Sequence, residues 1–216
     1  MTIRAYQRAD ADALYDICVR TGADGADARP AFRDPRLLGS VYVGPYLALE
    51  PHLAFVLDDA GPGGYVLAAR DTVAFGRACE EHWWPALRAQ YPVSAFPAGS
   101  ADAGIVAMLH DPPVADPDVL RSYPSHLHID LLPRIQGAGW GRRLIARALL
   151  ALAAAGSPGV HLGVSATNDR ARGFYHHMGF VELASGPGYV TMGHLLGHPR
   201  ERIPGANPSR EAGRSS

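Results

Sequence analysis

Side chains that could move protons occupy alternate positions in one short segment. His126, His128 and Asp130 are separated by single apolar residues in the run His-Leu-His-Ile-Asp. Successive side chains of a strand point to opposite faces, so these three would share one face. An imidazole titrates near neutral pH and can remove a proton from an ammonium group, directly or through a water. We therefore take His126 and His128 as candidate general bases, with Asp130 orienting or charge-balancing them.

Two other interpretations of this strand stay open. Its polar side chains could simply form the solvent-facing side of a half-buried strand. They could also bind a metal ion, but no further ligand cluster at a recognised spacing accompanies them in the sequence. We expect no metal ion.

A glycine-rich turn follows the strand directly. Leu131-Leu132-Pro133 ends the strand, and a helical pattern begins after Gln136-Gly137-Ala138-Gly139-Trp140-Gly141-Arg142. Glycine lets the backbone turn tightly and approach a ligand closely. The first amides of a helix have no intrahelical acceptor and lie at the positive end of its dipole. The turn therefore predicts a binding site for an anion such as a pyrophosphate.

The spacing of this turn excludes two other phosphate-binding motifs. A Rossmann fingerprint has a longer gap before its third glycine than the run Gly137-x-Gly139-x-Gly141 has. A P-loop needs a lysine, and all 20 basic side chains of this chain are arginine. Schiff-base chemistry on an internal lysine is excluded for the same reason.

A second motif lies further along the chain. It reads Asn168-Asp169-Arg170-Ala171-Arg172-Gly173-Phe174-Tyr175-His176-His177-Met178-Gly179-Phe180. With the glycine turn, which fits Gln/Arg-x-x-Gly-x-Gly/Ala, it resembles the signature of the GCN5-related N-acetyltransferase (GNAT) family. The family pattern Asn-x-x-Ala-x-x-Phe-Tyr-x-x-x-Gly-Phe is matched at every named position. Two motifs in the right order are far more specific than either alone.

The resemblance implies a fold, a cofactor and roles for particular residues. The fold would be α/β (α+β), a mixed, mostly antiparallel sheet flanked by helices, with the cofactor where strands 4 and 5 splay apart. The cofactor would be acetyl-CoA, serving as acyl-donor substrate. Asn168 would contact its pantetheine arm, Leu131 and Leu132 would do so through main-chain groups, and Tyr175 would protonate the departing thiolate. The remaining cofactor residues would be those of the turn, Gln136 to Arg142.

Two narrower resemblances refine this expectation. The pair His126 and His128 is similar to the paired histidines of arylalkylamine N-acetyltransferases, where the pair serves proton removal. Most of the chain, up to about Leu196, loosely resembles the acetyltransferase-like C-terminal domain of O-GlcNAcase. That domain lacks the pyrophosphate glycines, which this chain retains, and it keeps an aspartate at the position of Asp130. The glycosidase half is absent, so no sugar hydrolysis is expected.

The expected function is the transfer of an acetyl group to a primary amine by direct attack in a ternary complex. The amine could belong to a small molecule, a peptide or a protein lysine. The alternative is a non-catalytic module that binds acetyl-CoA or docks a partner. Trp83, Trp84, Tyr42 and Tyr46 are candidates for lining the acceptor cleft.

Hydrophobic periodicity and turn residues predict the elements that would position these groups. Expected strands cover 3–6, 53–57, 64–69, 127–132, 160–165, a segment from 180, and 189–195. Expected helices follow an N-cap at Asp10 and cover 41–49, 75–88, 142–155 and 169–178. The segments 21–35 and 92–123, which are rich in glycine, aspartate or proline, are expected to be irregular.

Composition limits the class of protein. With 216 residues, a net charge of −1 and 47% hydrophobic residues, the chain predicts a single domain over 1–197. The segment 198–216 is expected to be a disordered tail. Balanced charge argues against nucleic acid as a partner, and no apolar run could span a membrane. We expect a cytoplasmic monomer or homodimer, with Cys18 and Cys79 as buried apolar residues rather than a disulfide.

Overall fold

The computed structural model describes residues 1–197, so the predicted tail at 198–216 lies outside the described residues. A seven-stranded sheet forms its centre, in the order β1-β2-β3-β4-β5-β7-β6. The strands are β1 (Thr2–Ala5), β2 (Ala54–Asp58), β3 (Pro62–Ala69), β4 (Ser125–Leu131), β5 (Gly159–Ser165), β6 (Val181–Gly186) and β7 (Tyr189–Leu195). Neighbouring strands are antiparallel except β4 and β5, which confirms the predicted mixed, mostly antiparallel sheet.

The parallel pair β4 and β5 separates soon after it begins. Its register covers only Ser125 opposite Val160 and His126 opposite His161. Beyond these positions, β4 continues to Leu131 along β3, whereas β5 continues to Ser165 along β7. The sheet therefore opens between the second halves of β4 and β5.

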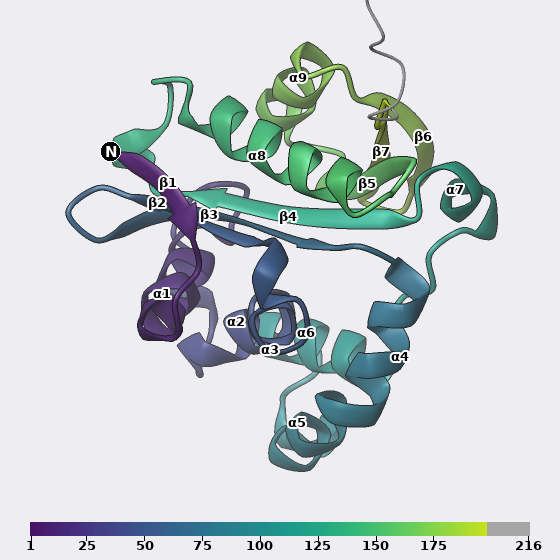
Figure 1. Cartoon of the computed structure of the whole chain (residues 1–216). Helices are drawn as coiled ribbons and strands as arrows, with labels where there is room; N and C mark the ends of the chain where they lie inside the picture. Colours follow the sequence, from purple (N-terminus) through teal and green to yellow (C-terminus); the bar gives the residue numbers. More distant parts are fainter. Residues whose placement is uncertain (198–216) are drawn as a thin grey trace, which may run out of the picture.

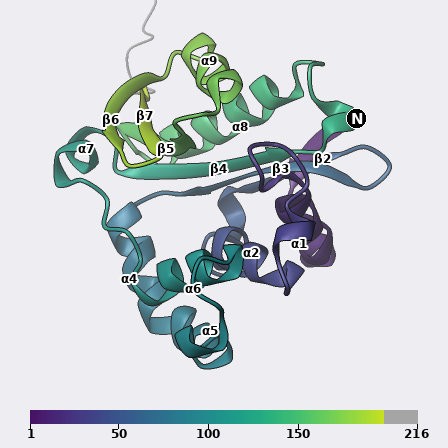
Figure 2. The ribbon, with the colours of Figure 1, turned by 180° about the vertical axis from the view of Figure 1, so that it is seen from behind.

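Helices cover both faces of the sheet (Figures 1 and 2). One face carries α8 (Trp140–Ala154) and α9 (Asp169–His177). The other carries α1 (Ala11–Thr21), α2 (Pro35–Tyr42), α3 (Gly44–Leu49), α4 (Thr72–His82), α5 (Trp84–Gln90) and α6 (Ala101–His110). The short α7 (Pro117–Ser122) leads into β4. No helix within 1–197 is long and apolar enough to cross a membrane.

Helix α8 shows how a periodic apolar stripe fixes an element on the sheet. Leu144, Ile145, Ala148 and Leu152 follow helical spacing, and all four are fully buried. Gly156 adopts a positive φ of 82° just after the helix, which favours glycine there. The predicted helix is confirmed, with its start at the glycine turn itself.

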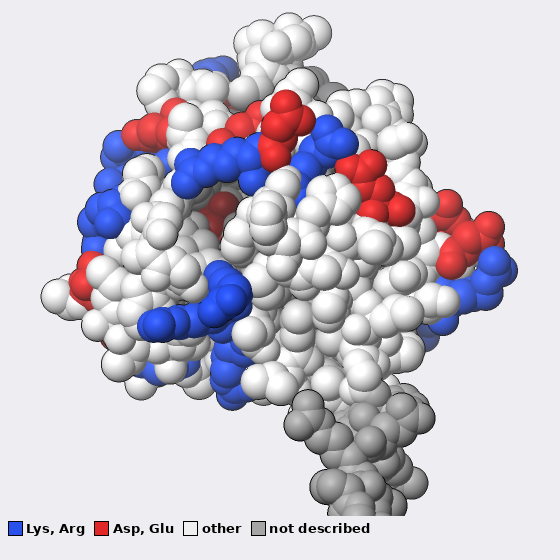
Figure 3. All heavy atoms as spheres, turned by 90° about the horizontal axis from the view of Figure 1, so that it is seen from above, with Lys and Arg blue, Asp and Glu red and all other residues white. Residues whose placement is uncertain are grey.

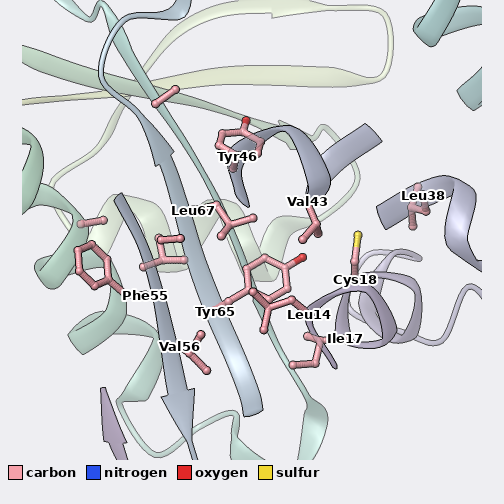
Figure 4. Close-up of a cluster of buried hydrophobic side chains, with 14 of the residues drawn as sticks. Leu14, Ile17, Cys18, Leu38, Val43, Tyr46, Phe55, Val56, Tyr65 and Leu67 are labelled. Atoms are coloured by element: carbon pink, nitrogen blue, oxygen red, sulfur yellow. The ribbon is translucent and has the colours of Figure 1, made fainter. Parts of the chain in front are cut away.

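A second buried cluster lies between the sheet and α1 to α3. Figure 4 shows the ring of Tyr65 among Leu14, Ile17 and Val43, with its hydroxyl directed toward Cys18. Tyr65 and Leu14 are completely buried. The phenol of Tyr65 thus lies under a helical layer that begins far earlier in the sequence.

The expectation that 92–123 is irregular is wrong, because α6 and α7 form within it. Ser100 caps α6 by accepting a hydrogen bond from the amide of Ala103, and Val106 and Leu109 anchor the helix in the core. Pro117 stands in the first turn of α7, where a missing amide hydrogen costs nothing. The prolines therefore delimit helices here instead of preventing them.

Two predicted helices are each divided by a proline. The segment 41–49 contains the end of α2 and all of α3, and the segment 75–88 contains parts of α4 and α5. Pro45 and Pro85 stand in the first turns of α3 and α5. A proline inside a continuous helix would remove one backbone hydrogen bond and clash with the preceding turn, so each helix restarts.

Asp10 stands at the N-cap position of α1, as predicted, but its side chain makes no capping hydrogen bond to that helix. Its carboxylate accepts hydrogen bonds from the Arg4 guanidinium and from the amide of Gln7. The Arg4 hydrogen bond lowers the pKa of Asp10. The residue therefore ties β1 to the start of the helical layer.

Candidate active site

A cavity of about 770 Å³ lies where β4 and β5 separate. Its walls come from the C-terminal end of α1, from α2 and α6, from β4 and β5, from the glycine turn and from α9. One side of the molecule is visibly hollowed in Figure 3, with acidic surface inside the hollow and basic side chains near its rim. The glycine turn and the Asn168–Phe180 motif therefore line the same cavity, at the opening between β4 and β5.

The glycine turn forms one end of this cavity. Gly137 and Gly139 have positive φ angles of 81° and 78°, and a Cβ added at either would meet no atom within 4 Å. Gly139 is the N-cap of α8, and no described side chain caps this helix or places an acid in its first turn. The first amides of α8 therefore face the cavity without a protein acceptor, which fits an anion.

The predicted cofactor residues of the turn are not all at the cavity. Leu131, Gln136 and Arg142 line it with Gly137, Gly139 and Gly141. Gln136 also donates a hydrogen bond to the carbonyl of Leu131 at 2.8 Å, which ties the turn to the end of β4. Leu132, Ala138 and Trp140 do not line the cavity. The amide of Leu132 is instead bonded to the carbonyl of Gly63.

Asn168 and Tyr175 both line the cavity from α9. Asn168 caps that helix, because its Oδ1 accepts a hydrogen bond from the amide of Ala171 at 3.0 Å. The ring of Tyr175 lies between Phe174 and Phe180, with centroids 5.4 Å and 5.6 Å away. Burial and the negative charge of Asp130 raise the pKa of Tyr175. Its hydroxyl therefore keeps its proton at neutral pH.

His128 and Asp130 form a hydrogen-bonded pair with Tyr65 at the side of the cavity. The Nε2 of His128 lies 3.1 Å from Oδ2 of Asp130 and 3.1 Å from the Tyr65 hydroxyl, which itself donates to Asp130. Tyr65 stands directly opposite Asp130 in the β3–β4 ladder. Burial alone would lower the pKa of His128, but the charge and hydrogen bond of Asp130 raise it to about 10. An imidazolium beside a carboxylate results.

His126 shares the face of His128 and Asp130 but does not line the cavity. The rings of Tyr46 and Phe75 pack against it, and its Nδ1 lies 2.8 Å from the hydroxyl of Thr72. Burial and the neighbouring histidines lower the pKa of His126 to about 3. The solvent-facing interpretation of this strand is therefore wrong, because the helical layer of α1 to α4 covers the face.

The possible metal ligands differ from those considered in the sequence. Ligand atoms of Cys18, His128 and Asp130 lie within 4.8 Å of one another, and His126 is not in this group. Hydrogen bonds among His128, Asp130 and Tyr65 account for the closeness of the two polar side chains without a cation.

Several cavity residues escaped sequence reasoning. Tyr42 was among the four aromatic candidates and does line the cavity, whereas Tyr46, Trp83 and Trp84 do not. The lining residues that were not predicted include Cys18, Asp24, Phe32 and Ile105, which share no motif and come from separate segments. Arg170 also lines the cavity and lies within the second motif, which assigns it no role. Cys18 lies in a helical stripe that indicates only core packing, so no local signal could have assigned it.

Comparisons with known proteins agree with this geometry. Residues 101–182 match the family model described as an acetyltransferase (GNAT) domain. Protein O-GlcNAcase from Rattus norvegicus and from Mus musculus is in each case 28% identical over 199 residues, which are 91% of this chain. The chain spans only 22% of the length of these curated relatives.

Solved structures show the same fold. The crystal structure of SsHAT is 42% identical, with a TM-score of 0.86 over 91% of this chain and 98% of that one. YncA from Salmonella typhimurium, a putative acetyltransferase solved with its cofactor acetyl-CoA, is 17% identical, with a TM-score of 0.53 over 97% of this chain and 98% of that one. The family model, the two motifs in one cavity and the 42% identity to a structure of nearly the same extent agree. The chain therefore belongs to the GNAT family of acetyltransferases.

Proposed function

We propose that this protein transfers an acetyl group from acetyl-CoA to a primary amine by direct attack in a ternary complex. The observation that supports the proposal is a single cavity lined by the open glycine turn, by Tyr175 and by the His128–Asp130 pair. Acetyl-CoA supplies an acyl group that is already activated as a thioester. The protein has to bind acetyl-CoA, exclude water, accept a proton from the substrate ammonium and donate a proton to the departing thiolate.

The glycine turn supports the binding of the diphosphate. Amides of Gly139 and of the first turn of α8 would donate to it, and the positive end of the helix dipole would favour its charge. Arg142 and Arg170 also line the cavity and add positive charge on the α8–α9 side. Asn168 and the main chain of Leu131 would contact the pantetheine arm.

The His128–Asp130 pair is our candidate for the base. Among the three residues predicted from the strand, these two line the cavity, and His126 does not. The Asp130 carboxylate would attract the substrate ammonium, and His128 in its neutral form would accept the proton. A buried imidazole with a pKa of about 3, as in His126, is too weak a base for an ammonium group.

Tyr175 is our candidate for the acid. Tyr175 lines the cavity, and its hydroxyl has no hydrogen-bond acceptor among the described residues and keeps its proton because its pKa is raised. Donating that proton to the departing thiolate would stabilise the leaving group.

The experiment that tests the proposal compares substitutions at two glycines that have the same backbone conformation. Gly139 and Gly156 both have positive φ and open space around a Cβ, and they stand at opposite ends of α8. We expect Gly139→Leu to weaken acetyl-CoA binding by about a hundredfold in calorimetry, because the side chain enters the anion site, with Gly156→Leu close to wild type. Equal affinities in both variants would reject the glycine turn as the cofactor site.

One observation favours a second candidate, a module that binds acetyl-CoA without transferring it. The ion pair with Asp130 holds His128 protonated at neutral pH, and a protonated imidazole cannot accept a proton. Tight binding of acetyl-CoA with no acetylation of any amine, even at alkaline pH, would support the module and reject the enzyme.

A further inference from the structure

The charges along the cavity are separated into two halves. Arg142 on α8 and Arg170 on α9 line the α8–α9 side of the sheet. Asp24, in the loop after α1, and Asp130 line the opposite side, where His128 balances one of the two carboxylates. One half of the cavity therefore suits the anionic cofactor, and the other half suits a cation.

The acidic half is otherwise apolar. Phe32, Leu38, Tyr42 and Ile105 line it from the loop before α2, from α2 and from α6. Cys18 completes this wall from α1 and is only 2% exposed. The charged groups of this half, Asp24 and the His128–Asp130 pair, lie outside this wall, whose own residues carry no charge.

A contact between distant segments joins two walls of the cavity. The Ser165 hydroxyl, at the end of β5, donates a hydrogen bond to the Asp24 carboxylate at 3.4 Å. Asp24 and Gly25 both have positive φ, at 51° and 92°, so the loop turns sharply toward β5. The acceptor thus has to fit a space walled on several sides and not a flat surface.

We propose that the acceptor is a compact primary amine with an uncharged, apolar body, held between the Phe32–Leu38–Tyr42–Ile105 wall and the Asp130 carboxylate. This inference rests on the proposed function, because it names the substrate class of the same site. Phe32, Leu38 and Ile105 offer no partner for a charge, so a second charged group that lay against this wall would lose its hydration and would bind poorly.

A matched pair of amines tests this substrate class. Hexylamine and 1,6-diaminohexane have the same carbon chain and differ by one terminal ammonium group. We expect kcat/KM for hexylamine to exceed that for 1,6-diaminohexane by about tenfold or more, consistent with selectivity set by hydrophobic pockets. A short peptide that carries one lysine should be a poorer acceptor than hexylamine. Equal or reversed preference in either comparison would overturn the inference.

A charge placed in the wall should reverse the preference. Ile105→Glu puts a carboxylate beside the acceptor body, so it should raise kcat/KM for 1,6-diaminohexane relative to hexylamine by about tenfold. Val114→Glu makes a similar change at a residue that is 93% exposed and outside the cavity, and it should leave the ratio unchanged. An unchanged ratio in a folded Ile105→Glu variant that still binds acetyl-CoA would contradict the proposed wall.

Binding without turnover separates this inference from the proposed function. Calorimetry with the CoA-saturated protein should show tighter binding of hexylamine than of 1,6-diaminohexane. If hexylamine binds preferentially but is never acetylated, the proposed enzyme is wrong and the acceptor class stands. If amines are acetylated without preference for the apolar one, the enzyme stands and the acceptor class is wrong.

Discussion

At the scale of single residues, two histidines of one strand are driven to opposite protonation states by their neighbours. His128 faces the Asp130 carboxylate, whereas His126 is surrounded by aromatic rings and other imidazoles. Burial acts against the charged form of both, and only His128 has an anionic partner to offset it. His126 and His128 are therefore expected to have different roles although they are only two positions apart.

The pH dependence of turnover should report the His128–Asp130 pair. Since His128 accepts a proton only when neutral and its pKa is raised to about 10, we expect kcat/KM to rise as pH approaches 10. In Asp130→Asn no negative charge offsets the burial of His128, so the pKa of His128 falls. The rise of kcat/KM should then occur at lower pH. Titration of the amine itself is identical in both proteins. An unmoved midpoint in the variant would exclude His128 as the base.

Loss of the Tyr175 hydroxyl should slow the chemical step alone. We expect Tyr175→Phe to lower kcat by about 10²- to 10⁴-fold, the range for one general acid, with little change in acetyl-CoA affinity. Tyr189→Phe is the control, because Tyr189 is half exposed and outside the cavity. Stopped-flow turnover and calorimetry on both variants measure the effect. A Tyr175→Phe enzyme with normal kcat would remove the residue from the mechanism.

At the scale of elements, α8 serves both the core and the site. Its apolar stripe holds it on the sheet, and this packing places its first turn at the opening between β4 and β5. The open N-terminus can face a ligand because the stability of the helix comes from packing and not from a capping side chain.

Packing of α8 can be tested within the helix. Leu152 is fully buried and Leu150 is 68% exposed, two positions away in the same helix. We expect Leu152→Ala to lower the free energy of unfolding by about 2–5 kcal/mol, because it leaves a cavity, and Leu150→Ala to change it by less than about 0.5 kcal/mol. Chemical denaturation of both variants provides the comparison. Similar losses in the two would mean that the helix does not pack as described.

At the scale of the whole molecule, stability should fall in acid partly because of His126. The pKa of His126 is about 3 in the folded protein and near the ordinary histidine value of 6.5 in the unfolded chain. Between these values the unfolded chain binds a proton that the folded one does not, so stability decreases as pH falls through this window. We expect the free energy of unfolding of His126→Gln, measured by chemical denaturation, to change less than that of wild type between pH 6.5 and 4.5. If the free energy of unfolding depends on pH in the same way in both proteins, burial does not keep His126 neutral.

Features that depend on residues close together in the chain could be predicted from the sequence. The glycine turn, the stripe of α8, the hairpin of β2 and β3, and the motif from Asn168 to Phe180 each depend on residues close together, and each predicts its element. Their order along the chain is also sufficient for the resemblance to the GNAT family. Where two local signals conflicted, as at the prolines of 92–123, the expectation of irregular structure was wrong.

Which of these residues come into contact depends on the packing of distant elements. Tyr65 and Asp130 are far apart in sequence and become partners because β3 and β4 pair in one register. Packing of α1 brings Cys18 to the same place, while the cover of Tyr46 and Phe75 keeps His126 away from the cavity. Periodicity shows which face of a strand a side chain takes, but not what covers that face. Burial and the charge of the neighbours then set the protonation state.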